Sequence, residues 1–411
     1  MIDDFGVMRA PRAVLFGNGQ RRSLGRVARR IGTRALICTD ARFAADAEMA
    51  VLRAALDEQG VTALVFDGTE AELPLAGISA CLEVARPFAP GMVIGVGGGS
   101  CLDMAKVVSL MLSHDGPADG FYGENRVPGP VLPVIAMPTT AGTGSEVTPV
   151  AVLGDSSRDL KVGISSPYLI PHTAICDPEL TVTCPPALTA LAGADATTHA
   201  IESFTAIRRE PTAGLAMERV FVGKNRLSDG HAVAAMRALW TYLPRAVANG
   251  ADLEARTEVM YAAMLAGLAF GSAGTAAAHA IQYPVGALTH TAHGLGVAAL
   301  MPYVMAFNRP ACTAEYAAVA RAMDIVGNDR EALADAAVRA VSDLFDTIRI
   351  PRTLAELGLK SDQLDWVARQ SLLASRLVTN NPRLLDLAGA TCIVNAAFDG
   401  DRPWAHLPAA K

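Results

Sequence analysis

The sequence predicts a chain of two domains, an α/β nucleotide-binding domain followed by an all-helical domain. In the first half, short apolar runs alternate with helix-like segments, and one of these runs leads into a glycine-rich loop. After about residue 185 the strand signals nearly vanish, and Ala-rich helical segments continue to the end. Alternating strands and helices are typical of an open parallel sheet with helices on both faces. We place the boundary after the Pro185-Pro186 pair, which gives domains 1–185 and 186–411.

The predicted elements follow from apolar runs and from helical composition. The expected strands lie at 35–40, 63–66, 92–96 and 131–137, and the helices of the same domain at 46–58, 76–86 and 102–113. The expected helices of the second domain lie at 187–205, 231–247, 253–280, 312–325, 330–347 and 362–376. Residues 223–230 combine Gly, Asn, Ser and Asp, which predicts an exposed loop.

Composition limits the classes of function. Of the 411 residues, 51% are hydrophobic and 18% are charged, which predicts a compact globular fold. A net charge of −6 offers no bulk attraction for nucleic acid. The seven cysteines are dispersed without a CxxC pair, which excludes a disulfide framework and is typical of a reducing cytoplasm. We therefore expect a cytoplasmic protein, without a signal peptide, a transmembrane helix or a role in membrane binding.

Two polar loops at strand ends predict a nucleotide site. The run Gly95 to Ser100 lies between an expected strand and an expected helix, where glycines allow a phosphate to approach the backbone and the free N–H groups of the helix. A second loop, 138–146, is rich in hydroxyl groups and glycine. Asp40 ends an earlier strand, where an acid accepts hydrogen bonds from a ribose 2′-OH and repels a 2′-phosphate, which favours NAD over NADP. A tight β–α turn and a helix-capping Asp remain the structural alternatives.

Asp195 and His199 are spaced by four residues, which places both side chains on one face of a helix. His279 and His293 lie 14 residues apart, with Pro284 and several glycines between them, and a helix ending near 280 followed by a loop could return His293 to the same site. One carboxylate and three imidazoles suit zinc or ferrous iron. From spacing alone, His290 competes for the place of the third histidine.

These motifs together resemble the iron-containing (group III) alcohol dehydrogenase family over nearly the whole chain. The motifs are Gly97-Gly98-Gly99-Ser100 with Asp103 and Lys106, the loop 138–146, Asp177-Pro178-Glu179-Leu180, Gly193 to His199 with Glu202, and His279 to His293-Gly294. The resemblance implies a dehydroquinate synthase-like architecture, with a Rossmann-like N-terminal domain, a helical C-terminal domain and an active site in the cleft between them. It also implies an NAD-dependent alcohol dehydrogenase that contains one divalent metal and forms a homodimer.

The resemblance assigns roles residue by residue. The implied metal ligands are Asp195, His199, His279 and His293, a choice that sets His290 aside. The implied cofactor contacts are Asp40, Gly98, Gly99, Ser100, Asp103, Thr139, Thr140, Thr143, Ser145, Lys161 and Leu180. Phe270 falls where relatives line the substrate pocket.

The chain departs from the family pattern at two positions. Cys101 stands where Pro is usual, and Tyr283 stands where many relatives carry a further active-site histidine. In the expected mechanism, the metal polarises the substrate oxygen during hydride transfer, and Tyr283 or solvent carries the proton. The substrate is expected to be a small, weakly polar alcohol or aldehyde, because cationic residues are scarce near the expected ligands.

Three alternatives remain open at this point. A metal-free enzyme similar to maleylacetate reductase shares the fold but lacks the full ligand set, so the retained Asp195 argues against it. A lyase similar to dehydroquinate synthase requires a strongly basic pocket, and the segment 186–300 is poor in Lys and Arg. A nucleotide-binding protein without turnover is the third, and the intact ligand set argues against it.

Overall fold

The computed structural model describes residues 5–155 and 161–406. All nine strands of this part of the chain lie between Ala13 and Cys176. The chain divides into two compact units, Arg9–Cys184 with Gly214–Val220, and Met1–Met8 with Pro185–Ala213 and Phe221–Lys411. The chain passes from one unit to the other at 184/185, but each unit also includes a short segment from the other side of this point. The segment up to Met8 belongs to the helical unit, and Gly214–Val220 belongs to the first unit. The sequence did not indicate either of these segments. The segment 214–220 is bound to the first unit by Arg9, whose guanidinium donates hydrogen bonds to the carbonyls of Ala216 and Val220.

The first unit is built on a six-stranded sheet in which every pair of neighbouring strands is parallel. In spatial order the strands are β1 (Ala13–Phe16), β9 (Thr173–Cys176), β6 (Val134–Pro138), β4 (Met92–Gly97), β2 (Arg34–Cys38) and β3 (Thr62–Phe66). The predicted parallel sheet is confirmed. A smaller sheet of β5 (Gly123–Glu124), β8 (Val162–Ser165) and β7 (Val150–Leu153) was not predicted, and its β7–β8 pair is antiparallel.

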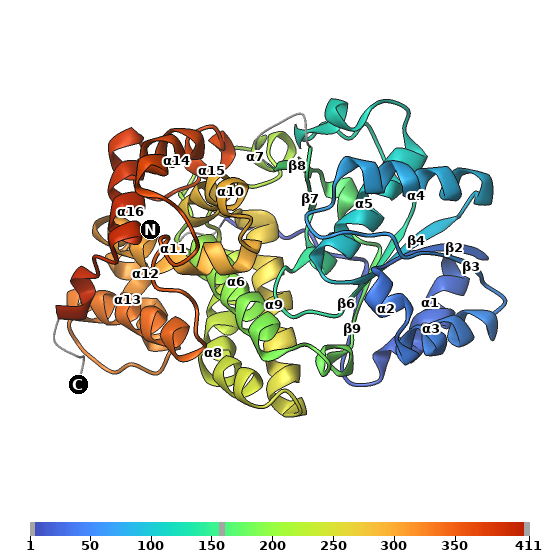
Figure 1. The fold of residues 1–411 in the computed structure, drawn as a ribbon, viewed down its shortest axis with the longest axis horizontal. Helices are drawn as coiled ribbons and strands as arrows, with labels where there is room; N and C mark the ends of the chain where they lie inside the picture. The colour runs from blue at the N-terminus through green and yellow to red at the C-terminus, as the bar shows by residue number, and fades with distance from the viewer. Residues whose placement is uncertain (1–4, 156–160, 407–411) are drawn as a thin grey trace. The chain divides into compact units, whose positions relative to one another are not determined.

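Helices cover both faces of the six-stranded sheet because successive strand residues point to opposite sides. Leu36 and Cys38 of β2 pack with α4 (Leu75–Phe88) and α5 (Gly99–Ser113). Ala35 and Ile37 of the same strand pack on the other face with α1 (Leu24–Ile31) and α3 (Ala47–Asp57). Figure 1 shows these two helix layers on either side of the strands. Two four-residue helices, α2 (Ala41–Ala44) and α7 (Leu215–Glu218), complete this unit.

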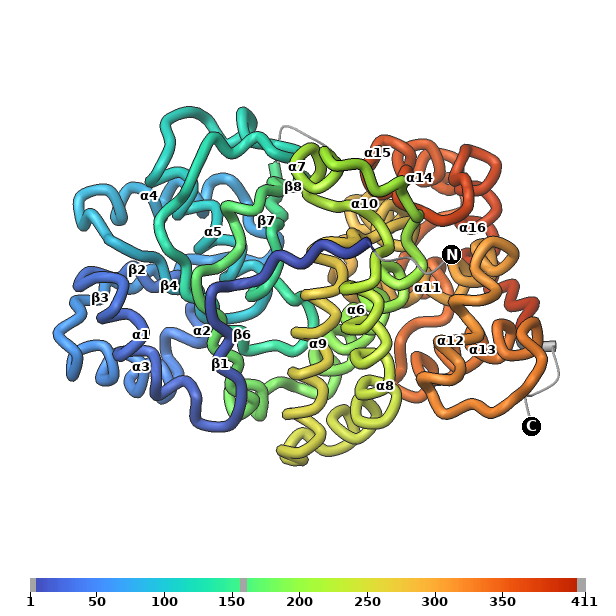
Figure 2. The backbone as a smooth tube through the Cα atoms, turned by 180° about the vertical axis from the view of Figure 1, so that it is seen from behind, coloured from blue at the N-terminus to red at the C-terminus, as the bar shows by residue number. Residues whose placement is uncertain are grey.

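In the described part of the second unit, the regular elements are helices alone. The α-helices are α6 (Pro186–Thr205), α8 (Arg226–Ala248), α9 (Leu253–Ala273), α10 (Ala277–Thr289), α11 (His293–Asn308), α12 (Thr313–Ala322), α13 (Arg330–Thr347), α14 (Leu364–Ser371), α15 (Ser375–Val378) and α16 (Leu387–Asp399). The helices α6, α8 and α9 run side by side, as Figure 2 shows. Among the described helices, no single one has both the length and the apolar character of a membrane span, although the bent pair α9 and α10 meets both criteria jointly.

Two local predictions in this unit are wrong. The expected single helix 253–280 is two helices, α9 and α10, bent by 102° at a break that contains Gly274, whose φ is 82°. The expected loop 223–230 is largely the first turns of α8. Asn225 is fully buried, and its side chain accepts hydrogen bonds from the backbone N–H groups of Leu227 and Ser228. The polar residues of the segment 223–230 form a helix cap, because Asn and Ser satisfy the free N–H groups of a first helical turn.

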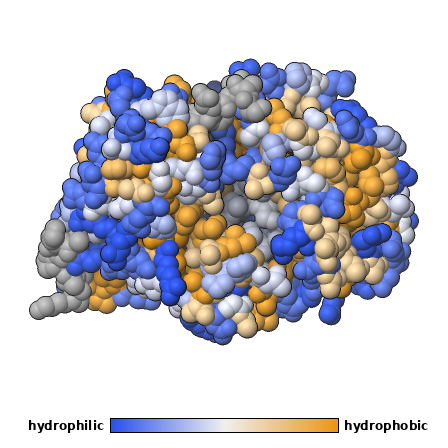
Figure 3. All heavy atoms as spheres, in the orientation of Figure 1, coloured by the Kyte–Doolittle hydropathy of each residue, from blue (hydrophilic) through white to orange (hydrophobic). Residues whose placement is uncertain are grey.

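The surface face drawn in Figure 3 intersperses hydrophilic and hydrophobic side chains. This pattern is ordinary for a folded protein, since apolar atoms contribute much of any protein surface. The candidate functional residues are buried polar groups and residues at strand ends.

Candidate metal centre and nucleotide-binding loops

The carboxyl ends of β2, β4 and β6 form one edge of the sheet, and the predicted nucleotide residues gather there. The register pairs Gly97 of β4 with Pro138 of β6, and Thr139 N–H donates to Gly97 O at 2.9 Å. A side chain carbon built on Gly97 would lie 3.7 Å from Asp40 Oδ2, so the Asp40 carboxylate also borders this loop. The sheet thus brings together three loops that are far apart in sequence, as expected for a ligand site in an open α/β sheet.

The glycine loop leaves the amino end of α5 open. Gly98 precedes the helix and no side chain caps it, so the N–H groups of the first turn are oriented toward the loop. A Cβ atom on Gly99 would lie only 2.8 Å from Thr143 Cγ2, and one on Gly98 would lie 3.7 Å from Thr140 Oγ1. The two loops can lie this close at Gly99 because it carries no side chain, whereas a Cβ on Gly98 would make an ordinary contact. The open end of a 15-residue helix is suited to a phosphate group.

The other predicted cofactor residues occupy more varied positions. Thr139 Oγ1 is buried and has no hydrogen-bond partner among the described residues, so this hydroxyl could donate a hydrogen bond to a ligand. The Asp103 carboxylate accepts hydrogen bonds from Ser145 Oγ at 2.6 Å and from Val152 N at 2.9 Å, so both predicted residues brace the second loop. Lys161 forms an ion pair with Glu72, and the Leu180 side chain lies in the core. Ser100 lies in the first turn of α5.

Behind these loops lies a group of buried ionisable side chains. Lys106 is fully buried, and its ammonium donates to the carbonyls of Thr148 at 3.0 Å and Val150 at 2.8 Å. Burial lowers the pKa of Lys106 to about 8 and raises the pKa of Glu146 to about 7. Burial also raises the pKa of Asp103, against the opposing attraction of Lys106. Asp103 holds the loop 138–146 through Ser145, and Lys106 holds the residues that follow the loop.

In the helical unit, three predicted metal ligands converge. Among the described residues, the group of His, Cys and acidic side chains whose ligand atoms all lie within 4.8 Å of one another is Asp195, His199 and His279. Asp195 Oδ1 lies 3.5 Å from His199 Nε2 and 3.7 Å from His279 Nε2. Two ligands of a tetrahedral zinc, each about 2.1 Å from the ion, lie about 3.4 Å apart. All three residues are buried, and the spacing of their donors fits one divalent metal.

The hydrogen bonds of the His279 ring support the assignment of this residue as a metal ligand. His279 Nε2 is buried and has no hydrogen-bond partner among the described residues, whereas Nδ1 lies 2.7 Å from Glu202 Oε2. A buried imidazole nitrogen without a hydrogen bond is costly unless it binds something else. The metal-ligand prediction did not include Glu202, although its position three residues after His199 on the same helix was a usable signal.

His293 lies beside this trio, as the first residue of α11. Its ring centroid is 5.3 Å from that of His279. The next residue, Gly294, makes this placement possible, because a Cβ atom there would lie 2.6 Å from Leu191 O and 3.1 Å from Asp195 Cβ. The competing His290 ends α10 in a left-handed conformation and is exposed. The expected helix end near 280 is wrong, since α10 continues to Thr289 with Pro284 inside it.

Two aromatic residues flank the metal trio. The Phe270 ring stacks on His199, with ring centroids 4.2 Å apart and planes inclined by 26°. Tyr283 lies one helical turn after His279 on α10, and its ring centroid is 6.4 Å from that of His293. The structure therefore places Phe270 and Tyr283 next to the predicted ligands, and both residues supply an aromatic face there.

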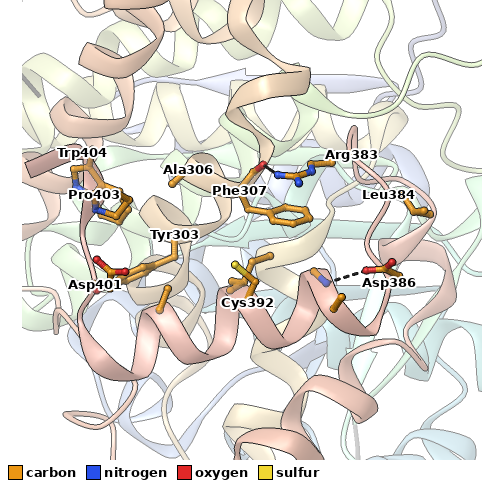
Figure 4. Close-up of a pocket in the computed structure, with 14 residues that line it drawn as sticks. Tyr303, Ala306, Phe307, Arg383, Leu384, Asp386, Cys392, Asp401, Pro403 and Trp404 are labelled. Carbon is orange, nitrogen blue, oxygen red and sulfur yellow. Dashed lines mark hydrogen bonds between the residues drawn. The ribbon is translucent and has the colours of Figure 1, made fainter.

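A separate cavity of about 650 Å³ lies between α11, α16 and the segment 401–404, and none of its lining residues is a predicted site residue. Figure 4 shows Phe307, Tyr303 and Trp404 around it. Arg383 donates to the carbonyl of Phe307 at 2.6 Å, and Asp386 accepts from Gly389 N at 2.8 Å. Both charged groups therefore stabilise the ends of neighbouring helices.

Comparison with known proteins agrees with both halves of this description. The profile described as "Iron-containing alcohol dehydrogenase" matches residues 11–178, and that described as "Fe-containing alcohol dehydrogenase family, C-terminal" matches residues 189–398. A long-chain-alcohol dehydrogenase of Geobacillus thermodenitrificans is 37% identical over 354 residues, which are 84% of each chain. The crystal structure of a 1,3-propanediol oxidoreductase superposes with a TM-score of 0.89 at 30% identity, covering 96% of this chain and 100% of that one. A sulfoacetaldehyde reductase from Bifidobacterium kashiwanohense, solved in complex with NAD+, gives a TM-score of 0.82 at 28% identity and covers 97% and 99%.

The close approach at Gly99 generates a prediction about nucleotide binding. Gly99→Ala forces the loop of Thr143 away from the amino end of α5, and such overpacking costs about 1–3 kcal/mol. We expect NADH affinity, measured by fluorescence titration, to fall about tenfold or more. The matched control is Gly230→Ala, which adds a methyl group to α8 with nothing within 4 Å and should leave NADH affinity unchanged. Equal NADH affinities for the two variants would contradict the assignment of the loop.

Proposed function

Because the chain belongs to the iron-containing alcohol dehydrogenase family, we propose that it interconverts a small alcohol and its aldehyde with NAD(H) and one bound divalent metal. Family membership makes it an oxidoreductase that acts on alcohols. The observation that carries the metal-dependent part of the proposal is the convergence of buried donors from Asp195, His199 and His279. Iron is the proposed metal, with zinc as the alternative that the same donors accept.

The residues of the helical unit bind the ion and shape the substrate site. Asp195, His199, His279 and His293 would hold a divalent cation, which supplies a Lewis acid that favours the alkoxide of the alcohol and polarises the carbonyl of the aldehyde. Phe270 supports the ring of His199 by stacking and presents an apolar surface beside it. An apolar wall suits a small and weakly polar substrate, and it excludes water from the reacting carbon.

The residues of the α/β unit position the dinucleotide. The open end of α5 and the hydroxyl groups of Thr139, Thr140 and Thr143 would bind the phosphates. Asp40 caps α2 by accepting a hydrogen bond from Phe43 N, and its other carboxylate oxygen borders the glycine loop, where it would accept a hydrogen bond from a ribose and repel a 2′-phosphate. The proposed cofactor is therefore NAD(H) in preference to NADP(H). Asp103 and Ser145 act indirectly, by bracing the second loop, and Lys106 holds Thr148 just after it.

The first test uses the wild-type protein. After anaerobic purification, elemental analysis should find about one iron or zinc per chain, because the donors form one site. Absorbance at the NADH band should show consumption of NADH with short unbranched aldehydes, and a lower kcat/KM with NADPH. A protein that contains no metal and stays inactive after addition of ferrous iron or zinc would overturn the metal-dependent proposal, while equal use of NADPH would overturn the role of Asp40.

The second test removes a ligand. His279→Ala should reduce bound metal to background and abolish turnover, because Nε2 of that ring is one of the three converging donors. His231→Ala, on the half-buried side of α8, removes a histidine outside the site and should keep both metal and activity. Full activity and stoichiometric metal in the His279 variant would show that the ligand assignment is wrong.

Tyr283 is the proposed proton carrier, and it lies beside the predicted metal ligand His293. Its ring lies near His293, and its phenol can both accept and donate a proton. Proton transfer by a positioned side chain contributes about 10²–10⁴-fold to rate, so Tyr283→Phe should lower kcat by at least the smaller factor, with little change in metal content. The measurement is steady-state kinetics as a function of pH. An unchanged kcat and pH profile would assign the proton transfer to solvent.

A further inference from the structure

The carboxylate of Glu202 makes three short hydrogen bonds that join two helices. Glu202 Oε1 accepts from Ala278 N at 2.7 Å, and Oε2 accepts from Ala276 N at 2.7 Å. The same Oε2 lies 2.7 Å from His279 Nδ1. Glu202 is 2% exposed and belongs to α6, whereas its three partners lie at the amino end of α10.

These partners assign the hydrogen-bond role of the His279 ring nitrogen that faces Glu202. Both oxygens of Glu202 already accept backbone N–H groups, so the carboxylate is an acceptor and Nδ1 must be the donor. A neutral imidazole with its proton on Nδ1 has a lone pair on Nε2. That is the atom that faces Asp195 Oδ1 at 3.7 Å. A carboxylate on the far nitrogen is how proteins commonly orient a metal-binding histidine.

The amino end of α10 explains why this carboxylate is held so firmly. The helix begins at Ala277, no side chain of its own caps it, and its first free N–H groups point at Glu202. The positive end of a helix dipole favours a negative charge at this place. The bend of 102° between α9 and α10 brings this helix end to Glu202. The same contact therefore fixes the helix, the carboxylate and the ring.

We propose that Glu202 is a positioning residue that holds His279 in the tautomer and orientation needed to bind the metal, using the amino end of α10 to fix its own carboxylate. This inference rests on the proposed metal-dependent function. It assigns Glu202 no contact with substrate or cofactor. Its effect passes entirely through the basicity and direction of His279 Nε2, so metal affinity is the quantity that reports it.

The variant Glu202→Gln tests the proposal because an amide cannot satisfy all three donors. If its oxygen faces Ala276 N and His279 Nδ1, its NH2 group opposes Ala278 N–H. In the reverse orientation the NH2 group donates to Nδ1, which then has to be the acceptor and moves the ring proton to Nε2. Either arrangement weakens the site. Thr205→Val is the matched control, since it removes another buried hydrogen bond of α6, from Thr205 Oγ1 to Ile201 O at 2.8 Å.

Metal affinity is measured by competition with a chelator, and Tm is measured with and without metal. For Glu202→Gln we expect a loss of about 10–100-fold in affinity. Each tenfold loss is about 1.4 kcal/mol, so the gain in Tm on adding metal shrinks. Thr205→Val should lower Tm of the metal-free and metal-loaded protein in parallel and keep the affinity. Parallel Tm losses with unchanged affinity in Glu202→Gln would overturn the proposal and leave Glu202 a structural residue.

A measurement on the wild-type protein covers the case in which Glu202→Gln does not fold. NMR of metal-free protein labelled with 15N-histidine, with His279 assigned by comparison with His279→Gln, reports which ring nitrogen carries the proton. We expect the proton on Nδ1, and a proton on Nε2 would overturn the proposal. If the wild-type protein binds no metal, the proposed function itself fails. If it binds metal and Glu202→Gln binds as tightly, the inference about Glu202 alone fails.

Discussion

The helical unit depends on burying two carboxylates, Asp195 and Glu202, in a region of apolar helices. Isolated buried charges are costly, so each must be offset by hydrogen bonds or by an opposite charge. Glu202 is offset by the amino end of α10. Asp195 faces the Nε2 atoms of His199 and His279. Side chains from α6, α10 and α11 meet around this point, and the bend after α9 and the bare backbone at Gly294 both serve that convergence.

The α/β unit solves a different problem, which is to present backbone N–H groups to a polyanion without a cluster of basic side chains. The β4 and β6 loops can lie against each other because Gly99 carries no side chain. The buried Lys106 stabilises the carbonyls behind the second loop rather than binding a phosphate itself. In a dehydrogenase the cofactor supplies the hydride chemistry, and the protein supplies the position and the electrostatic environment of the cofactor.

How far the sequence predicts this structure varies with the kind of signal. The parallel sheet, the carboxyl-end loops and the Asp195/His199 pair follow from period and spacing, which are local properties. The segment 223–230 was misjudged because Asn and Ser are equally at home in loops and in helix caps, and only the buried position of Asn225 distinguishes them. The break at Gly274 was missed because the flanking Ala-rich segments continue a helical pattern, and the contacts that fix the bend come from distant residues such as Asn380. Strands β1 and β9 have four residues each, too few to show a period.

The balance of charge in the metal centre argues for a divalent ion. The group of Asp195, Glu202, His199 and His279 places two carboxylates beside two imidazoles in a buried site. The dipole of α10 offsets part of the charge on Glu202, at about half an elementary charge for a helix end. The remaining carboxylate charge is buried, and among the described residues His279 Nε2 has no hydrogen-bond partner. A dication satisfies both conditions, whereas a bound water would satisfy only the ring nitrogen. The physical requirement that places Glu202 next to α10 is therefore the same requirement that would give the site the proposed affinity for a metal.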